Sequence, residues 1–165
     1  MRWLAALAAG IGAAWVARRA WGDEMQQADP DPVPADLRYL TTTSQPLENT
    51  PPRELWPALQ TLHRLVLQLR QRYGDLRVTS GYRSPAVNAA VGGVPSSLHL
   101  QARAVDVVPT QTDPAEVYAD LYSRREQLRG VLQEVILYEV NGRGTRLHIG
   151  LGSGARFFRK QTARI

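Results

Sequence analysis

The feature that most constrains the fold is a long amphipathic helix predicted over residues 53–73. Its apolar positions recur at helical spacing, and Gly74 follows as a stop signal; they are Leu55, Leu59, Leu62, Val66 and Leu69. A helix with one apolar stripe must bury that stripe against another layer. We therefore predict that residues 53–73 pack against a sheet formed by the rest of the chain.

Short strands and helices follow this helix. Asn141 and Gly142 begin a strong turn signal, which predicts a hairpin. The predicted strands cover residues 76–80, 104–108, 134–140 and 145–151, and shorter helices cover 85–91 and 114–128. The pattern favours an α+β fold in which helices flank an antiparallel sheet.

Length and composition limit the possible classes of protein. At 165 residues the chain is large enough for one compact domain. It has no cysteine, which excludes disulfides, thiolate metal ligands and a cysteine nucleophile. The net charge of +5 favours polyanions, although a genomic bias toward arginine explains it equally well, since Lys160 is the only lysine. Without clustered arginines and interleaved aromatics, we expect no nucleic-acid partner.

The chain divides into an N-terminal segment, a linker and a domain. Residues 1–22 contain about fifteen apolar residues after Arg2, which is typical of a signal peptide but also fits an uncleaved membrane anchor. Residues 23–50 are rich in Asp, Pro and Thr and predict a linker, with 33–40 as an extended strap. Residues 51–165 form the domain, and the basic, aromatic tail fits either a wall or membrane contact or a packed segment. We expect an exported protein facing the periplasm or cell wall.

Two of the three histidines lie in the least core-like stretches of the sequence. His99 and Asp106 are seven residues apart, and His148 follows between apolar residues. Two imidazoles and one carboxylate suit a divalent ion such as Zn²⁺, and three protein ligands leave the open position typical of a catalytic site. His63 lacks acidic or histidine neighbours, so we expect a boundary or surface residue there.

Three motifs, taken together, resemble those of the zinc D-Ala-D-Ala carboxypeptidases, whose fold is shared with the hedgehog signalling domain. The motifs are Ser80-Gly81-Tyr82-Arg83-Ser84, Ser97-x-His99-x6-Asp106 and Leu147-His148-Ile149, and the resemblance spans roughly residues 51–152. It implies a zinc site at His99, Asp106 and His148, and peptidoglycan peptides as substrates.

The resemblance also gives roles to residues near the ligands. It implies that Arg83 holds a substrate carboxylate or stabilises the oxyanion, whereas the alternative is an arginine that only pairs with a nearby aspartate. Ser80, Tyr82 and Ser97 flank the motifs and are candidates for substrate binding. Leu98 and Ala102 replace a glutamine and a glycine common in the family, and neither change removes a ligand.

The general base is not in its usual place, because Arg143 and Thr145 occupy positions where many relatives carry an acid or histidine. A four-residue turn would pair Leu137 with His148 and put Glu139 on the same face as that ligand. Glu139 is therefore the predicted base, with an exposed hairpin glutamate as the alternative. Because side chains alternate along a strand, this register puts Glu134 on the opposite face from Glu139.

The sequence thus predicts zinc-dependent hydrolysis of peptide bonds in peptidoglycan stem peptides or cross-links. The resemblance covers D,D-carboxypeptidases, dipeptidases and endopeptidases, so the bond that is cut stays open, as does the oligomeric state. The alternative is a catalytically inactive, zinc-containing module that binds the cell wall, which the missing acid near His148 favours.

Overall fold

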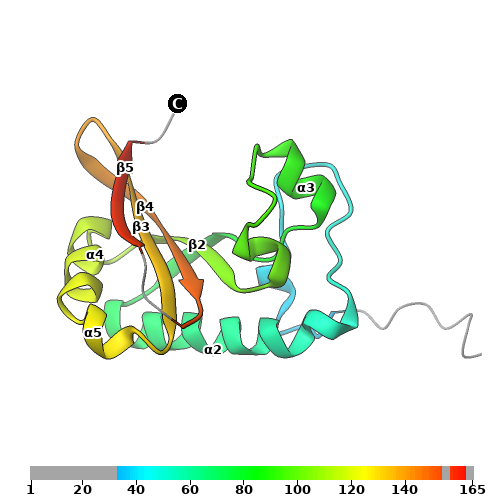
Figure 1. The fold of residues 1–165 in the computed structure, drawn as a ribbon, viewed down its shortest axis with the longest axis horizontal. Helices are drawn as coiled ribbons and strands as arrows, with labels where there is room; N and C mark the ends of the chain where they lie inside the picture. Colours follow the sequence, from blue (N-terminus) through cyan, green and yellow to red (C-terminus); the bar gives the residue numbers. More distant parts are fainter. Residues whose placement is uncertain (1–32, 154–156, 163–165) are drawn as a thin grey trace, which may run out of the picture. The chain divides into compact units, whose positions relative to one another are not determined.

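The computed structural model describes residues 33–153 and 157–162, which belong to one compact unit. Five strands form a mixed sheet in the order β1-β2-β4-β3-β5 (Figure 1). Neighbouring strands are antiparallel except for β3 and β5, which are parallel. The predicted α+β fold is confirmed, and the sheet is mostly antiparallel.

The elements follow the predicted order closely. The strands are β1 (Leu76–Ser80), β2 (Ala104–Pro109), β3 (Leu132–Val140), β4 (Arg143–Leu151) and β5 (Phe157–Thr162). The helices are η1 (Arg38–Leu40), η2 (Arg53–Leu55), α2 (Trp56–Tyr73), α3 (Pro85–Ala90), η3 (Leu98–Gln101), α4 (Pro114–Ser123) and α5 (Arg125–Leu128). The helix expected over 114–128 is therefore two helices, which meet at Arg124.

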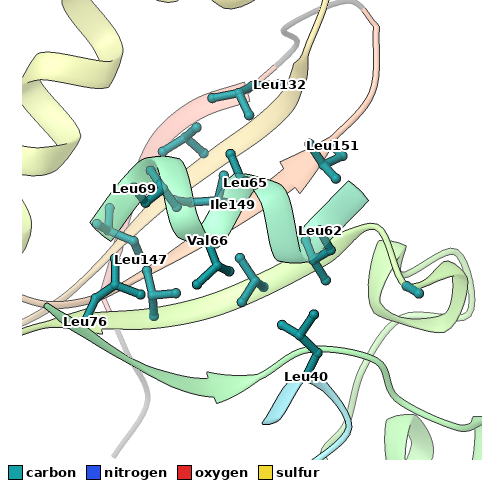
Figure 2. Packing of buried hydrophobic residues seen from close by; sticks show 14 of the residues in the cluster. Leu40, Leu62, Leu65, Val66, Leu69, Leu76, Leu132, Leu147, Ile149 and Leu151 are labelled. Carbon is teal, nitrogen blue, oxygen red and sulfur yellow. The ribbon is translucent and has the colours of Figure 1, made fainter. Parts of the chain in front are cut away.

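Helix α2 lies along one face of the sheet, as its apolar stripe predicts (Figure 1). The stripe is buried and meets the odd-numbered residues of the central strands (Figure 2). The core residues shared by these layers include Leu59, Leu62, Val66, Leu69, Val105, Val107, Val135, Leu137, Leu147 and Ile149. Because side chains alternate along a strand, the even-numbered residues, among them Asp106 and His148, face the other side.

The segment before α2 is part of the core and not a free linker. Val33, Leu37 and Leu40 are buried, with exposed fractions of 8%, 1% and 0%. Residues 33–40 reach this position through a turn and η1, so the expected extended strap is wrong in its conformation. The compact unit accordingly begins at Val33 and not at 51. We call residues 33–50 the strap.

The two ends of the chain were expected to hold an export signal and a basic, aromatic tail. Residues 1–22, the expected signal peptide or anchor, lie outside the described residues. Within the described part, no helix combines the length and apolar character that a bilayer crossing requires. Residues 157–162 of the tail form β5 at the edge of the sheet, beside β3.

The hairpin turn is tighter than expected. Asn141 and Gly142 both have positive φ, of 51° and 74°, as a two-residue hairpin loop of this composition requires. Val140 therefore pairs with Arg143, and the predicted pairing of Val140 with Thr145 is wrong.

The register also shifts between Tyr138 and Glu139, where the pairing of β3 with β4 is irregular. As a result, Ile136 faces His148, and the predicted partner Leu137 does not. A shift of one residue moves every side chain to the other face of the sheet. The faces of all β3 residues are therefore the reverse of those the sequence predicted.

The burial of the strap predicts a stability effect. Replacing Leu40 with alanine removes fully buried methyl groups, and we expect the free energy of unfolding to fall by about 2–5 kcal/mol. Leu47→Ala, at a side chain that is 42% exposed in the same segment, should change it by less than about 0.5 kcal/mol. Denaturant titration measures both, and equal effects would show that the strap is not part of the core.

Candidate metal site

His99 is held by its own turn and by the loop after β1. The Ser97 hydroxyl accepts a hydrogen bond from the His99 backbone amide at 3.3 Å and caps η3. The His99 ring donates from Nδ1 to the Gly81 carbonyl at 2.5 Å, and the side chain is only 2% exposed. Because a carbonyl can only accept, Nδ1 carries the proton and Nε2 presents a lone pair.

Asp106 and His148 are cross-strand partners on β2 and β4. Both face the side of the sheet away from α2, and both are buried. Asp106 Oδ1 lies 2.8 Å from His148 Nδ1 and 3.3 Å from His99 Nε2, and the two nitrogen atoms are 3.2 Å apart. The structure thus brings the three predicted ligands together.

The orientation of His148 completes a set of acceptor atoms. His148 Nε2 lies 3.0 Å from Glu134 Oε1 and Nδ1 lies 2.8 Å from Asp106 Oδ1, so the metal-free ring can donate from both nitrogens. When a metal displaces the Nδ1 proton, Glu134 keeps Nε2 protonated and Nδ1 presents a lone pair. Lone pairs of His99, Asp106 and His148 then point at one place. In a tetrahedral zinc site the ligand atoms are about 3.3–3.6 Å apart, close to the spacing here. These residues fit a divalent ion with an open coordination position.

The pKa values in this group show that the site favours a positive charge. Burial raises the pKa of Asp106, but the hydrogen bond from protonated His148 and the interaction with the neighbouring His99 ring outweigh it and leave the pKa well below its usual range. Burial lowers the pKa of His148, yet the hydrogen bonds with Asp106 and Glu134 raise it to about 9. Without metal a proton on His148 supplies the charge, and a bound metal would displace it.

Glu134 is a site residue that the sequence placed on the wrong face. It pairs with Gly150 across the hairpin, and its hydrogen bond with His148 lowers its pKa despite partial burial. A Cβ at Gly150 would lie 2.8 Å from Glu134 Cγ, so the missing side chain gives Glu134 room to lean toward His148. The sequence signal for this contact was Gly150, which follows His148 by two residues and pairs with the acidic residue Glu134.

Glu139, the predicted base, does not belong to the site. It lies on the face of the sheet that α2 covers, because it alternates with Tyr138 beyond the register shift. Its carboxylate pairs with Lys160 on β5 at 3.2 Å, and it does not line the cleft. The prediction that Glu139 points at the metal is therefore wrong, and the cause is the irregular pairing between Tyr138 and Glu139, because the shorter turn alone would have kept Glu139 on the face of His148.

Arg83 binds the ligand Asp106. Its Nη2 donates to Asp106 Oδ2 at 2.6 Å, and its Nε donates to the Ser80 hydroxyl at 2.8 Å. The aspartate pairing that the alternative expects is present, and 17% of the Arg83 side chain stays exposed to the cleft, so the role with substrate stays a prediction. Arg83 and the histidines together use both oxygens of Asp106.

The other predicted substrate contacts divide into two groups. Ser80 and Ser97 line the cleft beside the ligands. Tyr82 is buried in the core with 4% exposure, and its backbone amide donates to the Leu40 carbonyl at 2.7 Å. Tyr82 does not line the cleft, so its predicted contact with substrate is wrong; its apolar ring anchors the loop that precedes Arg83.

Asn49 is a buried residue that no sequence pattern singles out, because it falls in the expected linker. Its Nδ2 donates to the carbonyls of Thr41 and Tyr82 at 2.8 and 3.0 Å, and its Oδ1 accepts from the Ser84 amide at 2.7 Å. These bonds attach the strap to both sides of Arg83. The strap therefore positions the loop that supports His99 and Asp106.

A cleft of about 960 Å³ opens beside the three ligands. Its sheet side includes Ile136, Tyr138 and Gln161, and its other side includes the segment around Gly92 and Gly93. The charged residues of its wall are Arg77, Arg83, Asp106, Glu134, Arg146 and Arg159, and His99 and His148 lie among them. The arrangement gives a substrate access to the open side of the ligand group.

The packing at Gly150 predicts an indirect effect on metal binding. A Cβ at residue 150 would lie 2.6 Å from Leu98 Cδ1 and 2.8 Å from Glu134 Cγ, so Gly150→Ala should displace Glu134 from His148, press on the turn that holds His99, and lower the affinity for Zn²⁺ by about 10–100-fold. Gly130→Ala is the control, because a Cβ there meets no atom within 4 Å. Competition titration with a zinc chelator measures both affinities, and an unchanged affinity in Gly150→Ala would contradict the role of Glu134.

Comparison with known proteins supports the family that the sequence motifs indicated. The family model described as Peptidase M15 matches residues 35–136, more than half of the chain. The match includes Arg83, His99, Asp106 and Glu134 and ends before His148. No curated protein matches the chain. The family expected from the motifs is confirmed: the chain belongs to the Peptidase M15 family.

Proposed function

We propose that this chain is a zinc-dependent peptidase acting on peptidoglycan stem peptides or cross-links, of D,D-carboxypeptidase or endopeptidase type. The family supports a metallopeptidase. The observation that most supports zinc is the convergence of His99 Nε2, Asp106 Oδ1 and His148 Nδ1 beside an open cleft. The peptidoglycan substrate is supported by the Ser80–Ser84 motif and its resemblance to D-Ala-D-Ala carboxypeptidases.

Peptide hydrolysis needs an activated carbonyl and a base. When bound, zinc would polarise the scissile carbonyl and make water more acidic. Among the described residues, Glu134 is the only carboxylate besides Asp106 that lines the cleft. We assign Glu134 the proton transfer: it takes a proton from the attacking water and gives it to the leaving amine as the C–N bond breaks.

Arg83 contributes through Asp106 and through its own charge. Its hydrogen bonds to Asp106 and Ser80 fix the orientation of the ligand carboxylate. The guanidinium also stays positively charged at the edge of the cleft, where it favours the negative charge that develops on the carbonyl oxygen. Arg83 is thus a positioning residue first, and an electrostatic contributor second.

The proposal includes export. Residues 1–22 would act as a signal peptide or a membrane anchor, so that the domain faces the periplasm or cell wall, where peptidoglycan is found. The positive net charge of +5 agrees with an anionic wall polymer as partner. The rival, an inactive wall-binding module, rested on the missing acid near His148, and Glu134 supplies such an acid from the neighbouring strand.

The ligand set predicts the metal content. The wild-type chain should bind about one zinc, and His99→Ala or His148→Ala should lose it, because each removes one of three ligands. His63→Ala is the matched control, since His63 bonds to the Tyr39 hydroxyl at 2.9 Å and belongs to no ligand group. Elemental analysis of the purified proteins measures the content. Zinc retained in both ligand variants would place the ion elsewhere.

The choice of base is tested by two glutamates on the same strand. Glu134→Gln keeps an oxygen that can accept from His148 but removes the basicity, so hydrolysis should fall by about 10²–10⁴-fold with zinc retained. Glu139→Gln should leave hydrolysis near the wild-type rate, because Glu139 pairs with Lys160 away from the cleft.

The measurement is the release of new amino groups from purified peptidoglycan at neutral pH. Full activity in Glu134→Gln would exclude it as the base. No release by the zinc-loaded wild-type chain would favour the inactive wall-binding module.

A further inference from the structure

The metal ligands belong to a row of side chains that crosses the whole sheet. The strand pairings connect one residue of each strand, and these residues face the cleft. From β1 to β5 the row is Ser80, Asp106, His148, Ile136 and Arg159. Arg159 thus lies on the same face as the metal site, two strands from His148.

A second row lies beside the first. Arg146 is two residues from His148 on β4 and pairs with Tyr138, which pairs with Gln161. The Arg146 guanidinium lies 4.3 Å from the centre of the Tyr138 ring, a cation–π contact that holds the exposed side chain over the cleft. Arg146 and Arg159 therefore lie in adjoining rows on the cleft face of the sheet.

The charges of these two arginines are open to a ligand, whereas the carboxylates of the cleft are engaged. Asp106 bonds to Arg83 and the histidines, and Glu134 bonds to His148. Both Arg146 and Arg159 are exposed, and within the described part of the chain neither has a carboxylate at ion-pair distance. Arg159 lies close enough to Glu134 for its charge to help lower the pKa of that carboxyl, but among the described residues no ion pair holds either arginine, and both present positive charge to the cleft.

Sheet geometry gives the distance from the metal ligands. Two residues along β4 place Arg146 about 7 Å from His148, and two strand spacings place Arg159 about 10 Å from it. An extended peptide advances about 3.3–3.6 Å per residue. A peptide whose scissile bond lies at the ligands would therefore bring its second or third residue over these arginines.

We propose that Arg146 and Arg159 form a carboxylate-binding subsite that selects peptides with an acidic residue two or three positions from the scissile bond. The proposal rests on the proposed peptidase function and defines its substrate class. Guanidinium groups suit carboxylates because their planar donors can form paired hydrogen bonds. Arg83 does not serve this purpose, since its Nε and Nη2 already bond to Ser80 and Asp106 and its charge is paired with the Asp106 carboxylate.

The test compares two peptides on the zinc-loaded full chain by calorimetric titration. They end in D-Ala-D-Ala and differ only in glutamate or glutamine three residues before that bond; a second pair carries the change two residues before it. The wild type should bind one glutamate peptide about tenfold more tightly than its glutamine partner. Raised ionic strength should weaken the preference, because the arginines are exposed.

Variants of Arg146 and Arg159 test whether these residues cause the preference for the glutamate peptide. Arg146→Gln and Arg159→Gln should each reduce it, and the double variant should abolish it with zinc content unchanged. Arg143→Gln is the matched control, because Arg143 is exposed on the same hairpin but does not line the cleft. Arg159→Glu should invert the preference toward a peptide with lysine at the same position, which loss of folding cannot produce.

The outcomes separate the subsite from the proposed activity. Equal binding of glutamate and glutamine peptides by the wild type, no binding of either, or a preference that survives in the double variant overturns the subsite. A preference that follows Arg146 and Arg159 supports it, even if neither peptide is hydrolysed. In that last case the proposed peptidase function fails, and the subsite stands.

Discussion

The site depends on the pairing of Asp106 with His148 across β2 and β4. A buried carboxylate is costly unless its oxygens are satisfied, and here Oδ1 faces two imidazoles while Oδ2 accepts from Arg83. This arrangement keeps Asp106 ionised in the core and aims three lone pairs at one point. The sheet provides it by placing an acid and a histidine in register on the face that α2 leaves open.

Supporting contacts fix the orientation of each ligand. Gly81 holds Nδ1 of His99, Glu134 holds Nε2 of His148, and both contacts leave the other nitrogen for a metal. The strap extends this support, because Asn49 binds both sides of the loop that contains Arg83. A segment with linker-like composition therefore helps to determine the geometry of the site, and the domain includes it.

Much of the fold could be read from the sequence, because α2 and the central strands have unambiguous periodicity. The three candidate ligands, which the structure brings together, were selected from residue type and motif, and both are local properties. The cleft glutamate that bonds to His148 was missed because Glu139 and Glu134 lie on opposite faces, and only the register distinguishes them. That register depends on a two-residue turn at Asn141 and an irregularity at Tyr138, which no periodic pattern reveals. Asn49 was missed because its partners are backbone groups distant in sequence.

The central claim is that His99, Asp106 and His148 hold one zinc ion through specific atoms. Anomalous diffraction at the zinc absorption edge, from crystals of the zinc-loaded chain, tests it most directly. The account predicts a single peak bonded to Nε2 of His99, one oxygen of Asp106 and Nδ1 of His148, with Glu134 still bound to His148 Nε2 and one coordination position open to the cleft. An ion bound through Nε2 of His148, a fourth protein ligand that closes the site, or no peak between these residues would contradict it.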